Sequence, residues 1–297
     1  MNLNLLKSHP YISPDIKIEK FNDPYPYIII DNLFKPEIYK KMCDKFHTYI
    51  SKVEKPHGQV GDTGMSYDAL IYSMREEDCV DGYDFFKFKL WQIFISNIFD
   101  IEFNQHMAYS LHFHKGSPEK PSKDGWPHAD LSICSAIEDP EKSIKLIGDC
   151  DYTDDTIHAQ PHTKKIMRSV AMLYYFNNKN NLEEKDGGGT GIYKSYNSYS
   201  FIKEIKPINN RLFAFEISPK SYHGFVGAKF DRSSMVSWFH SSPSYIVNKN
   251  LDLYKQRFTQ NKDGLFEFWK KNDRWTLDLD PDYSKFFDKP FNEIFKK

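Results

Sequence analysis

Two side chains of types that commonly bind divalent metals stand two residues apart near the middle of the chain. Residues 126–132 read Trp-Pro-His-Ala-Asp-Leu-Ser, which contains His128 and Asp130. On an extended strand, residues i and i+2 project from the same face, so the imidazole and the carboxylate would point together. The pair would offer two adjacent ligands to a divalent transition metal. Alone it is weak evidence, because the chain has 11 His and a buried His near a turn carboxylate would give the same pattern.

A further ligand and an anion-binding group follow later in the chain. His223 lies at the start of a predicted strand, and two His with one carboxylate form the facial triad of non-haem Fe(II) oxygenases. Arg232 begins the next predicted strand, and Ser234 shares its face. A guanidinium gives a carboxylate two parallel hydrogen bonds, so this pair predicts a pocket for the distal carboxylate of a dicarboxylate co-substrate. The simpler alternatives are a turn at His223-Gly224 and a surface ion pair between Arg232 and Asp231.

Taken in order, these residues resemble the 2-oxoglutarate- and Fe(II)-dependent oxygenases, particularly the branch related to prolyl hydroxylases. The matching motifs are His128-Ala129-Asp130, then Gly187-Gly188-Gly189-Thr190, then His223, then Arg232 with Ser234. The glycine run predicts a tight turn into a strand and not a phosphate loop, since no Lys-bearing helix follows it. The resemblance covers roughly residues 24–243. It implies a double-stranded β-helix in which His128, Asp130 and His223 bind Fe(II) while Arg232 and Ser234 bind 2-oxoglutarate.

The resemblance also implies a reaction. O2 and 2-oxoglutarate would be co-substrates, 2-oxoglutarate would be decarboxylated to succinate, and a C–H bond of the substrate would be oxidised. Halogenating relatives have Gly or Ala in place of Asp130, so the carboxylate favours hydroxylation, desaturation or ring closure over chlorination. In this family a Tyr from the first or third core strand often reaches the co-substrate, which makes Tyr109 and Tyr174 candidates.

The elements that must position these residues follow from the hydrophobic pattern. From about residue 106, short runs rich in β-branched and aromatic residues alternate with Gly, Pro, Asn and Lys, which is typical of strands. The predicted strands are 106–114, 127–133, 167–177, 189–194, 200–206, 211–217, 222–227 and 232–240. Eight strands at this spacing predict a mainly β, double-sheet jelly roll. In that topology the second and seventh strands are antiparallel neighbours, so His128 and His223 could face each other.

Helices are predicted on both sides of this core. The first part of the chain has a short buried strand at 24–31, then amphipathic helices from Pro36 and around 85–99, whose apolar faces suit packing better than a cofactor site. A charged, helical extension follows Pro243. The prediction is a single domain over 1–297, comprising N-terminal braces (1–104), a jelly-roll core (105–243) and a C-terminal extension (244–297).

One stretch, 135–166, is too long and polar for a hairpin loop. Its acidic residues are Glu138, Asp139, Glu141, Asp149, Asp151, Asp154 and Asp155. The simple interpretation is a solvated loop. The sharper one is a mobile lid that attracts a cationic substrate such as an amine or amino acid. A lid favours an enclosed site and a small-molecule substrate over a Pro, Lys or Asn side chain of a protein. A non-catalytic jelly-roll binding protein is a further alternative.

Composition limits the partners. The chain has 40 Lys+Arg and 41 Asp+Glu, so no broad basic face for nucleic acid is expected. No apolar run approaches the roughly 18 residues of a membrane span, and the N-terminal residues lack the pattern of a secretory signal. The 4 Cys are scattered without a CxxC pair, which argues against a disulfide framework or a structural zinc site. These features predict a cytoplasmic enzyme that binds neither nucleic acid nor membrane. Neither the substrate nor the oligomeric state follows from the sequence.

Overall fold

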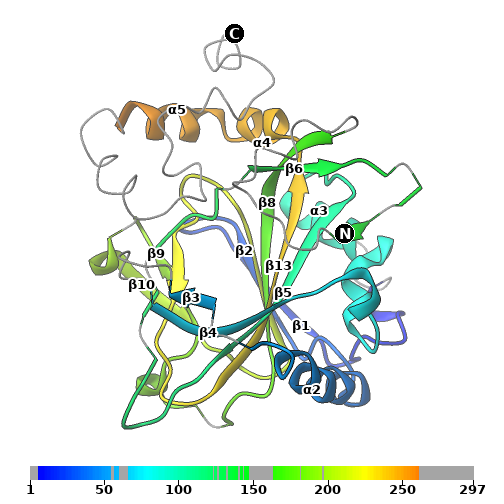
Figure 1. The fold of residues 1–297 in the computed structure, drawn as a ribbon. Coiled ribbons are helices and arrows are strands. Elements are labelled where there is room, and N and C mark those ends of the chain that lie inside the picture. Colours follow the sequence, from blue (N-terminus) through cyan, green and yellow to red (C-terminus); the bar gives the residue numbers. More distant parts are fainter. Residues whose placement is uncertain are drawn as a thin grey trace.

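Two β-sheets and a set of flanking helices make up the fold in the computed structural model (Figure 1). The structure describes residues 6–54, 57–59, 66–122, 124–125, 127–131, 133–139, 141–142, 144–146, 163–180, 182–195 and 197–260. Side chains from the two sheets meet between them, for example at Tyr175 and Thr190, whose hydroxyl oxygens lie 2.6 Å apart. No helix in these ranges is long and apolar enough to cross a membrane.

The larger sheet has ten strands. Its main path, in spatial order, is β1 (Lys17–Phe21), β2 (Tyr27–Asp31), β11 (Arg211–Glu216), β8 (Thr163–Tyr175), β13 (Arg232–Ser241), β5 (His106–His114), β4 (Ser66–Ser73) and β3 (His57–Gln59). Off this path, β6 (Ile133–Ile137) pairs antiparallel with β8, and β7 (Lys145–Leu146) pairs parallel with β5.

The smaller sheet has the order β10 (Phe201–Ile205), β9 (Thr190–Tyr193) and β12 (His223–Phe225). An isolated antiparallel bridge between His128 and His223 continues it past β12. Counted along the predicted jelly roll, the centre of the large sheet has strands six, three, eight and one. The small sheet has strands five, four, seven and, at the bridge, two. This alternation between sheets is the double-stranded β-helix that the sequence predicted.

Each predicted core strand except 127–133 largely overlaps an observed strand. In that segment His128 forms an isolated bridge and Ile133 begins β6, and between them the backbone at Asp130 turns to a φ of 62° and leaves the extended conformation. A tight turn at Asn209-Asn210 precedes β11, with Asn210 at a φ of 62°. Strands β1, β3 and β4 were not predicted. They extend the large sheet at its two edges.

Helix α2 (Pro36–Ile50) begins at a Pro, whose fixed φ suits the first turn, and buries Met42 and Phe46. The helix predicted near 85–99 is divided into a 3₁₀ turn, η2 (Tyr83–Lys87), and α3 (Lys89–Phe99), because Phe88 between them is extended at a ψ of 140°. The remaining elements are η1 (Glu76–Asp78), η4 (Glu184–Asp186), η5 (Ser198–Ser200), α4 (Pro243–Lys249) and α5 (Leu251–Gln260).

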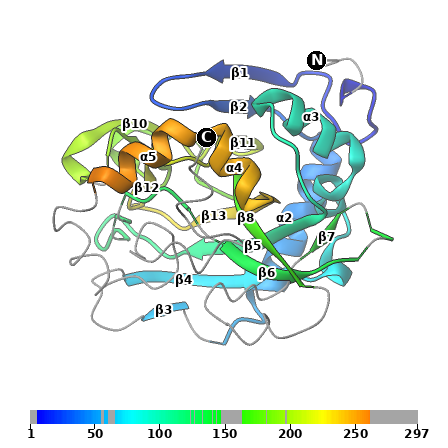
Figure 2. The same cartoon turned by 90° about the horizontal axis from the view of Figure 1, so that it is seen from above.

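The pleat gives the large sheet two faces of different character. On the outer face, Phe46 of α2 packs against Phe113 of β5, and Phe86 of η2 packs against Tyr109 and Tyr174. Figures 1 and 2 both show α2 and α3 on the side of the large sheet away from β10. By register, the outer face of β5, β8 and β13 comprises Met107, Tyr109, Leu111, Phe113, Val170, Met172, Tyr174, Ser233, Met235, Ser237 and Phe239.

The inner face is turned toward the small sheet. By register it comprises Ala108, Ser110, His112, His114, Ala171, Leu173, Tyr175, Arg232, Ser234, Val236 and Trp238. Tyr175 reaches Thr190 of β9 from this face, which fixes its direction. The inner face therefore carries most of the polar side chains of these strands.

The predicted insertion starts on the large sheet. Its first part forms β6 and β7, and the backbone N–H of Leu146 donates to Oε1 of Glu76 at 2.9 Å. Residues 147–162, with four of the seven acidic residues, lie outside the described residues. The lid remains a prediction.

Candidate functional site

Backbone pairing brings His128 and His223 together. The N–H of His128 donates to the carbonyl of His223 and the N–H of His223 donates to the carbonyl of His128, both at 2.9 Å. Direct opposition in an antiparallel pair brings side chains close, and the two imidazole centroids lie 4.4 Å apart. The prediction that these residues face each other across strands two and seven is confirmed.

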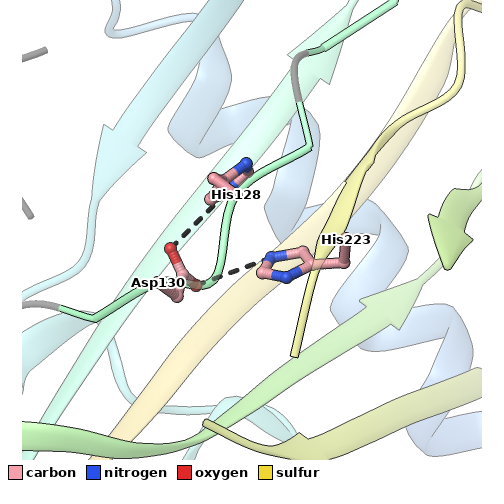
Figure 3. Close-up of side chains that lie close together, drawn as sticks. All are labelled: His128, Asp130 and His223. Carbon is pink, nitrogen blue, oxygen red and sulfur yellow. Dashed lines mark ion pairs between the residues drawn. The ribbon is translucent and has the colours of Figure 1, made fainter. Parts of the chain in front are cut away.

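Asp130 completes the cluster (Figure 3). Its Oδ1 lies 3.5 Å from Nε2 of His128, and its Oδ2 lies 3.7 Å from Nε2 of His223. One ligand atom from each of the three residues lies within 4.8 Å of the others. The expected convergence is present, but the expected reason was wrong. Asp130 approaches His128 through its left-handed turn and not along an extended strand.

These residues fit a divalent transition metal. Ligands bound to one ion at about 2.0–2.2 Å lie about 3 Å apart when adjacent, close to the separations found here. The carbonyl of Ser221 can only accept, so Nδ1 of His223, 2.9 Å away, carries the proton and Nε2 is left as a metal ligand. Two imidazoles and one carboxylate suit Fe(II) with open positions for co-substrates.

The ionisation states also suit metal binding. Burial alone would raise the pKa of Asp130, but the charge of Arg168 and the hydrogen bond from His128 outweigh it and hold the pKa well below its usual range. Burial and the neighbouring His128 together lower the pKa of His223 to about 4, against the opposing effect of the Asp130 charge. The carboxylate is thus charged and the His223 imidazole neutral near neutral pH, as ligation requires.

The sequence did not identify two further partners of Asp130. Nη1 of Arg168 donates to Oδ1 of Asp130 at 3.1 Å, and Nε1 of Trp238 donates to Oδ2 at 2.7 Å. The sequence indicates both residues only weakly. Arg is rare in this chain, and Trp238 lies an even number of residues from Arg232 and Ser234, so it is expected on the same face of the strand.

Arg232 lies inside the barrel and is 3% exposed. Its Nε donates to the carbonyl of Gly188 at 3.1 Å, and its guanidinium carbon lies 5.3 Å from the ring centroid of Tyr175. The surface ion pair with Asp231 is therefore wrong, and Asp231 is exposed and accepts from the backbone N–H of Gly116. A buried guanidinium on the inner face is placed to receive an anion.

Ser234 supplies a second polar group beside Arg232. It is 0% exposed, and its Oγ has no hydrogen-bond partner among the described residues. A buried hydroxyl without a partner costs free energy, and a bound carboxylate would satisfy it. The pair therefore fits the distal carboxylate of 2-oxoglutarate.

The glycine run shapes this pocket. Gly188 has a φ of 85°, and a Cβ there would lie 2.7 Å from the ring of Phe230. A Cβ at Gly187 would lie 2.1 Å from the carbonyl oxygen of Gly227. These contacts confirm the predicted tight turn, and they explain how the Gly188 carbonyl comes to face Arg232.

The expectation for Tyr109 and Tyr174 is wrong. Both lie on the outer face, where the hydroxyl of Tyr174 donates to Oδ1 of Asn210 at 2.8 Å. The next residue, Tyr175, is the one that faces the barrel beside Arg232. His114, opposite Arg232 and stacked on Phe225 at 4.2 Å, was also missed as a pocket residue.

Comparisons with known proteins agree with this geometry. A sequence model of the 2OG-Fe(II) oxygenase superfamily matches residues 149–240, which contain His223, Arg232 and Ser234. No curated protein matches the chain. The match confirms the family resemblance and the predicted Fe(II), 2-oxoglutarate and O2.

Several solved structures are similar over most of this chain. A prolyl 4-hydroxylase from Phytophthora capsici has 12% identity and a TM-score of 0.45, covering 73% of this chain and 60% of its own. A prolyl 4-hydroxylase from Pseudomonas putida has 12% identity and a TM-score of 0.44, covering 72% and 91%. A Trichoplax adhaerens prolyl hydroxylase, in complex with a hypoxia inducible factor peptide fragment, has 16% identity and a TM-score of 0.46, covering 72% and 82%.

The chain thus spans about three fifths of the length of the Phytophthora protein. The family match covers less than half of the chain; together with the His128, Asp130 and His223 cluster it supports the resemblance to the 2OG-Fe(II) oxygenase superfamily.

Proposed function

We propose that this oxygenase hydroxylates a C–H bond of a small molecule, with His128, Asp130 and His223 as metal ligands and Arg232 with Ser234 as the site of the distal carboxylate of 2-oxoglutarate. One observation carries the proposal. The three candidate ligands and the buried Arg232 project into the same space between the two sheets, although they come from two distant segments of the chain, 128–130 and 223–232. A binding protein without redox chemistry has no need of both sites together.

Bound Fe(II) would supply the redox chemistry that couples decarboxylation of 2-oxoglutarate to succinate and CO2 with oxidation of the substrate. The chain's own residues orient the groups. Arg232 and Ser234 would hold one end of the co-substrate. Along β13 they lie six and four residues from Trp238, whose indole contacts Asp130. At about 3.3 Å per residue, that places the carboxylate pocket well separated from the ligands along β13.

Asp130 bears on the type of oxidation. A charged carboxylate at this position occupies the place that a halide would need, so hydroxylation is favoured over halogenation. Burial of Asp130 and His223, each 6% exposed, also limits the access of water to the reacting centre.

A small-molecule substrate is supported by the position of the insertion. Strand β6 begins three residues after Asp130, and it pairs with the part of β8 that precedes Arg168. The start of the insertion therefore stands next to the candidate metal ligands, where a lid would enclose a small substrate. A peptidyl hydroxylase would need an open groove at the same place.

The proposal is tested by turnover of the full chain with Fe(II), 2-oxoglutarate and O2. Succinate would be measured against a panel of amines, amino acids and other small molecules, and against Pro-, Lys- and Asn-containing peptides. We expect a small molecule to raise succinate formation and to gain one oxygen atom by mass. Stimulation by peptides alone would reject the small-molecule class in favour of a peptidyl hydroxylase. If no succinate forms under any of these conditions with Fe(II) present, the proposal that the chain is a catalyst is rejected.

A further inference from the structure

We propose that Arg168 and Trp238 form a clamp that positions the carboxylate of Asp130 for the metal. The proposal rests on the metal site proposed above. Neither residue belongs to the three candidate ligands, and each contacts Asp130 directly. They act as positioning residues, because their effect on the metal passes through the carboxylate.

The two donors hold different oxygens of one carboxylate. Nη1 of Arg168 donates to Oδ1, the oxygen nearer to His128, and Nε1 of Trp238 donates to Oδ2, the oxygen nearer to His223. The terminal torsion of an Asp side chain has broad wells, so a carboxylate without partners rotates easily. Two donors on opposite oxygens remove that freedom and fix the plane that the metal must meet.

The donors also order each other. The guanidinium carbon of Arg168 lies 3.9 Å from the ring centroid of Trp238. A guanidinium stacked on an indole is held by attraction to the ring face. Arg168 comes from β8 and Trp238 from β13, so the clamp is built on paired strands of the large sheet and not on a loop.

A β-bulge brings Arg168 to the inner face. Phe239 pairs with Val170, but His240 pairs with Arg168, so β8 has one extra residue at Ser169. Without the bulge, regular alternation would place Arg168, two residues from Val170, on the outer face with it. Bulges near functional sites commonly re-aim a side chain in this way. Ser169 itself donates from Oγ to the carbonyl of Phe239 at 3.1 Å, which stabilises the irregular pairing.

The backbone of Asp130 is restrained as well. Its φ of 62° lies in the left-handed region, which most residues with a side chain visit rarely and which Asp tolerates better than most. The clamp restrains Asp130 through its side chain, and the bridge between His128 and His223 restrains the backbone two residues earlier. The ligand geometry is therefore prepared before the metal binds.

The positive charge of Arg168 opposes metal binding, whereas its hydrogen bond to Asp130 favours it. A guanidinium near the site repels a divalent cation, so an account based only on charge predicts tighter metal binding when Arg168 is neutralised. The positioning account predicts weaker binding. The two effects have opposite signs, which makes the substitution informative. Trp238 is neutral, so Trp238→Phe removes one donor without that complication.

The experiment titrates the full-length chain with Co(II) alone, measuring the dissociation constant by calorimetry and the visible spectrum of the bound ion. For Trp238→Phe and Arg168→Gln we expect affinity to fall by roughly 10–100-fold, the range typical of groups that orient a metal ligand. Arg168→Lys keeps the charge and a donor and should restore part of the loss. Because the two residues stack, the double variant should lose less than the sum of the two losses.

Matched controls remove the same groups elsewhere. Arg211→Gln breaks a two-bond ion pair with Asp31, with distances of 2.6 and 2.8 Å, on strand β11 of the same sheet. Trp91→Phe removes a buried indole N–H that has no hydrogen-bond partner among the described residues. Co(II) affinity should be unchanged in both, which separates loss of the clamp from general loss of stability.

The outcomes are distinct. Unchanged affinity in Trp238→Phe, or tighter binding in Arg168→Gln, would overturn the clamp while leaving the metal site intact. Absence of Co(II) binding by the unaltered chain would instead reject the metal site of the proposed function. If Arg168→Gln fails to fold by circular dichroism, Trp238→Phe and Arg168→Lys still decide the question.

Discussion

The outer and inner faces of strands β5, β8 and β13 differ in the side chains that they carry and in what those side chains contact. The outer face packs Tyr109 and Tyr174 against Phe86. The inner face carries Arg232, Ser234 and the other polar groups of the barrel. Neighbours in sequence therefore have unrelated roles. The hydroxyl of Tyr174 bonds to Asn210 in the packing layer, whereas that of Tyr175 bonds to Thr190 across the barrel.

The two faces of the large sheet therefore serve different purposes. Its large apolar side chains form the packing layer under the helices, and its polar side chains mark the site. The comparison has testable consequences, because substitutions on the outer face should change stability and those on the inner face should change ligand binding.

The largest effect is expected in the outer packing layer. Phe86 is fully buried and its ring contacts Phe34, Trp91, Tyr109 and Tyr174. Phe86→Ala should lower the free energy of unfolding by about 3–5 kcal/mol, because it removes a buried ring and leaves a cavity. Denaturant unfolding would measure this, and Co(II) affinity of the folded variant should be unchanged. A variant of normal stability that binds Co(II) poorly would break the division between the faces.

On the inner face, Arg232→Gln should reduce the binding free energy of 2-oxoglutarate by about 2–5 kcal/mol, the usual effect of removing one partner of a buried charge pair. Titration of the Co(II)-loaded chain with 2-oxoglutarate would measure it. Co(II) affinity should stay the same, since Arg232 lies six residues along β13 from Trp238, the residue of that strand that contacts Asp130. Equal 2-oxoglutarate affinity in variant and parent would remove Arg232 from the pocket.

The two adjacent tyrosines give a sharper test. Tyr174→Phe and Tyr175→Phe each remove one buried hydroxyl hydrogen bond, so each should cost about 0.5–1.5 kcal/mol of stability. Only Tyr175→Phe should also weaken 2-oxoglutarate binding, because Tyr175 lies beside Arg232. The reverse pattern would mean that the strand register is wrong by one residue.

The smallest effect concerns two serines of β13. Ser234 and Ser237 are both 0% exposed, and neither Oγ has a hydrogen-bond partner among the described residues, but they lie on opposite faces. Both Ala variants should leave stability equal or slightly higher, because an unpaired buried hydroxyl is removed. Ser234→Ala should cost about 0.5–1.5 kcal/mol of 2-oxoglutarate binding, and Ser237→Ala none. Equal losses in both variants would contradict the assignment of faces.

The sequence was informative where polar residues interrupt apolar strands. His128, Asp130, His223, Arg232 and Ser234 stand out for that reason, and the structure brings the first three together and buries Arg232 and Ser234 between the sheets. Most of the core strands were also predictable, because they are short apolar runs with turn residues at their ends, whereas β1, β3 and β4 at the sheet edges were not.

Register was not predictable in the same way. Strands β5 and β8 are buried on both faces, so alternation alone does not say which face lines the barrel. The sequence alone therefore does not distinguish Tyr174 from Tyr175 as the residue that faces the barrel. Arg168 was hidden further by the bulge at Ser169, which reverses the face that simple alternation predicts. The left-handed turn at Asp130 was equally invisible, since Asp is compatible with both conformations.

The most direct test of the central claim is anaerobic titration of the Fe(II)-loaded chain with 2-oxoglutarate, followed by visible absorption. A 2-oxo acid chelated to Fe(II) gives a metal-to-ligand charge-transfer band. We expect the band in the unaltered chain, its loss in His223→Ala, and a need for much more 2-oxoglutarate in Arg232→Gln. An Fe(II)-loaded chain that gives no band at saturating 2-oxoglutarate would contradict the co-substrate site, and a chain that binds no Fe(II) would contradict the triad.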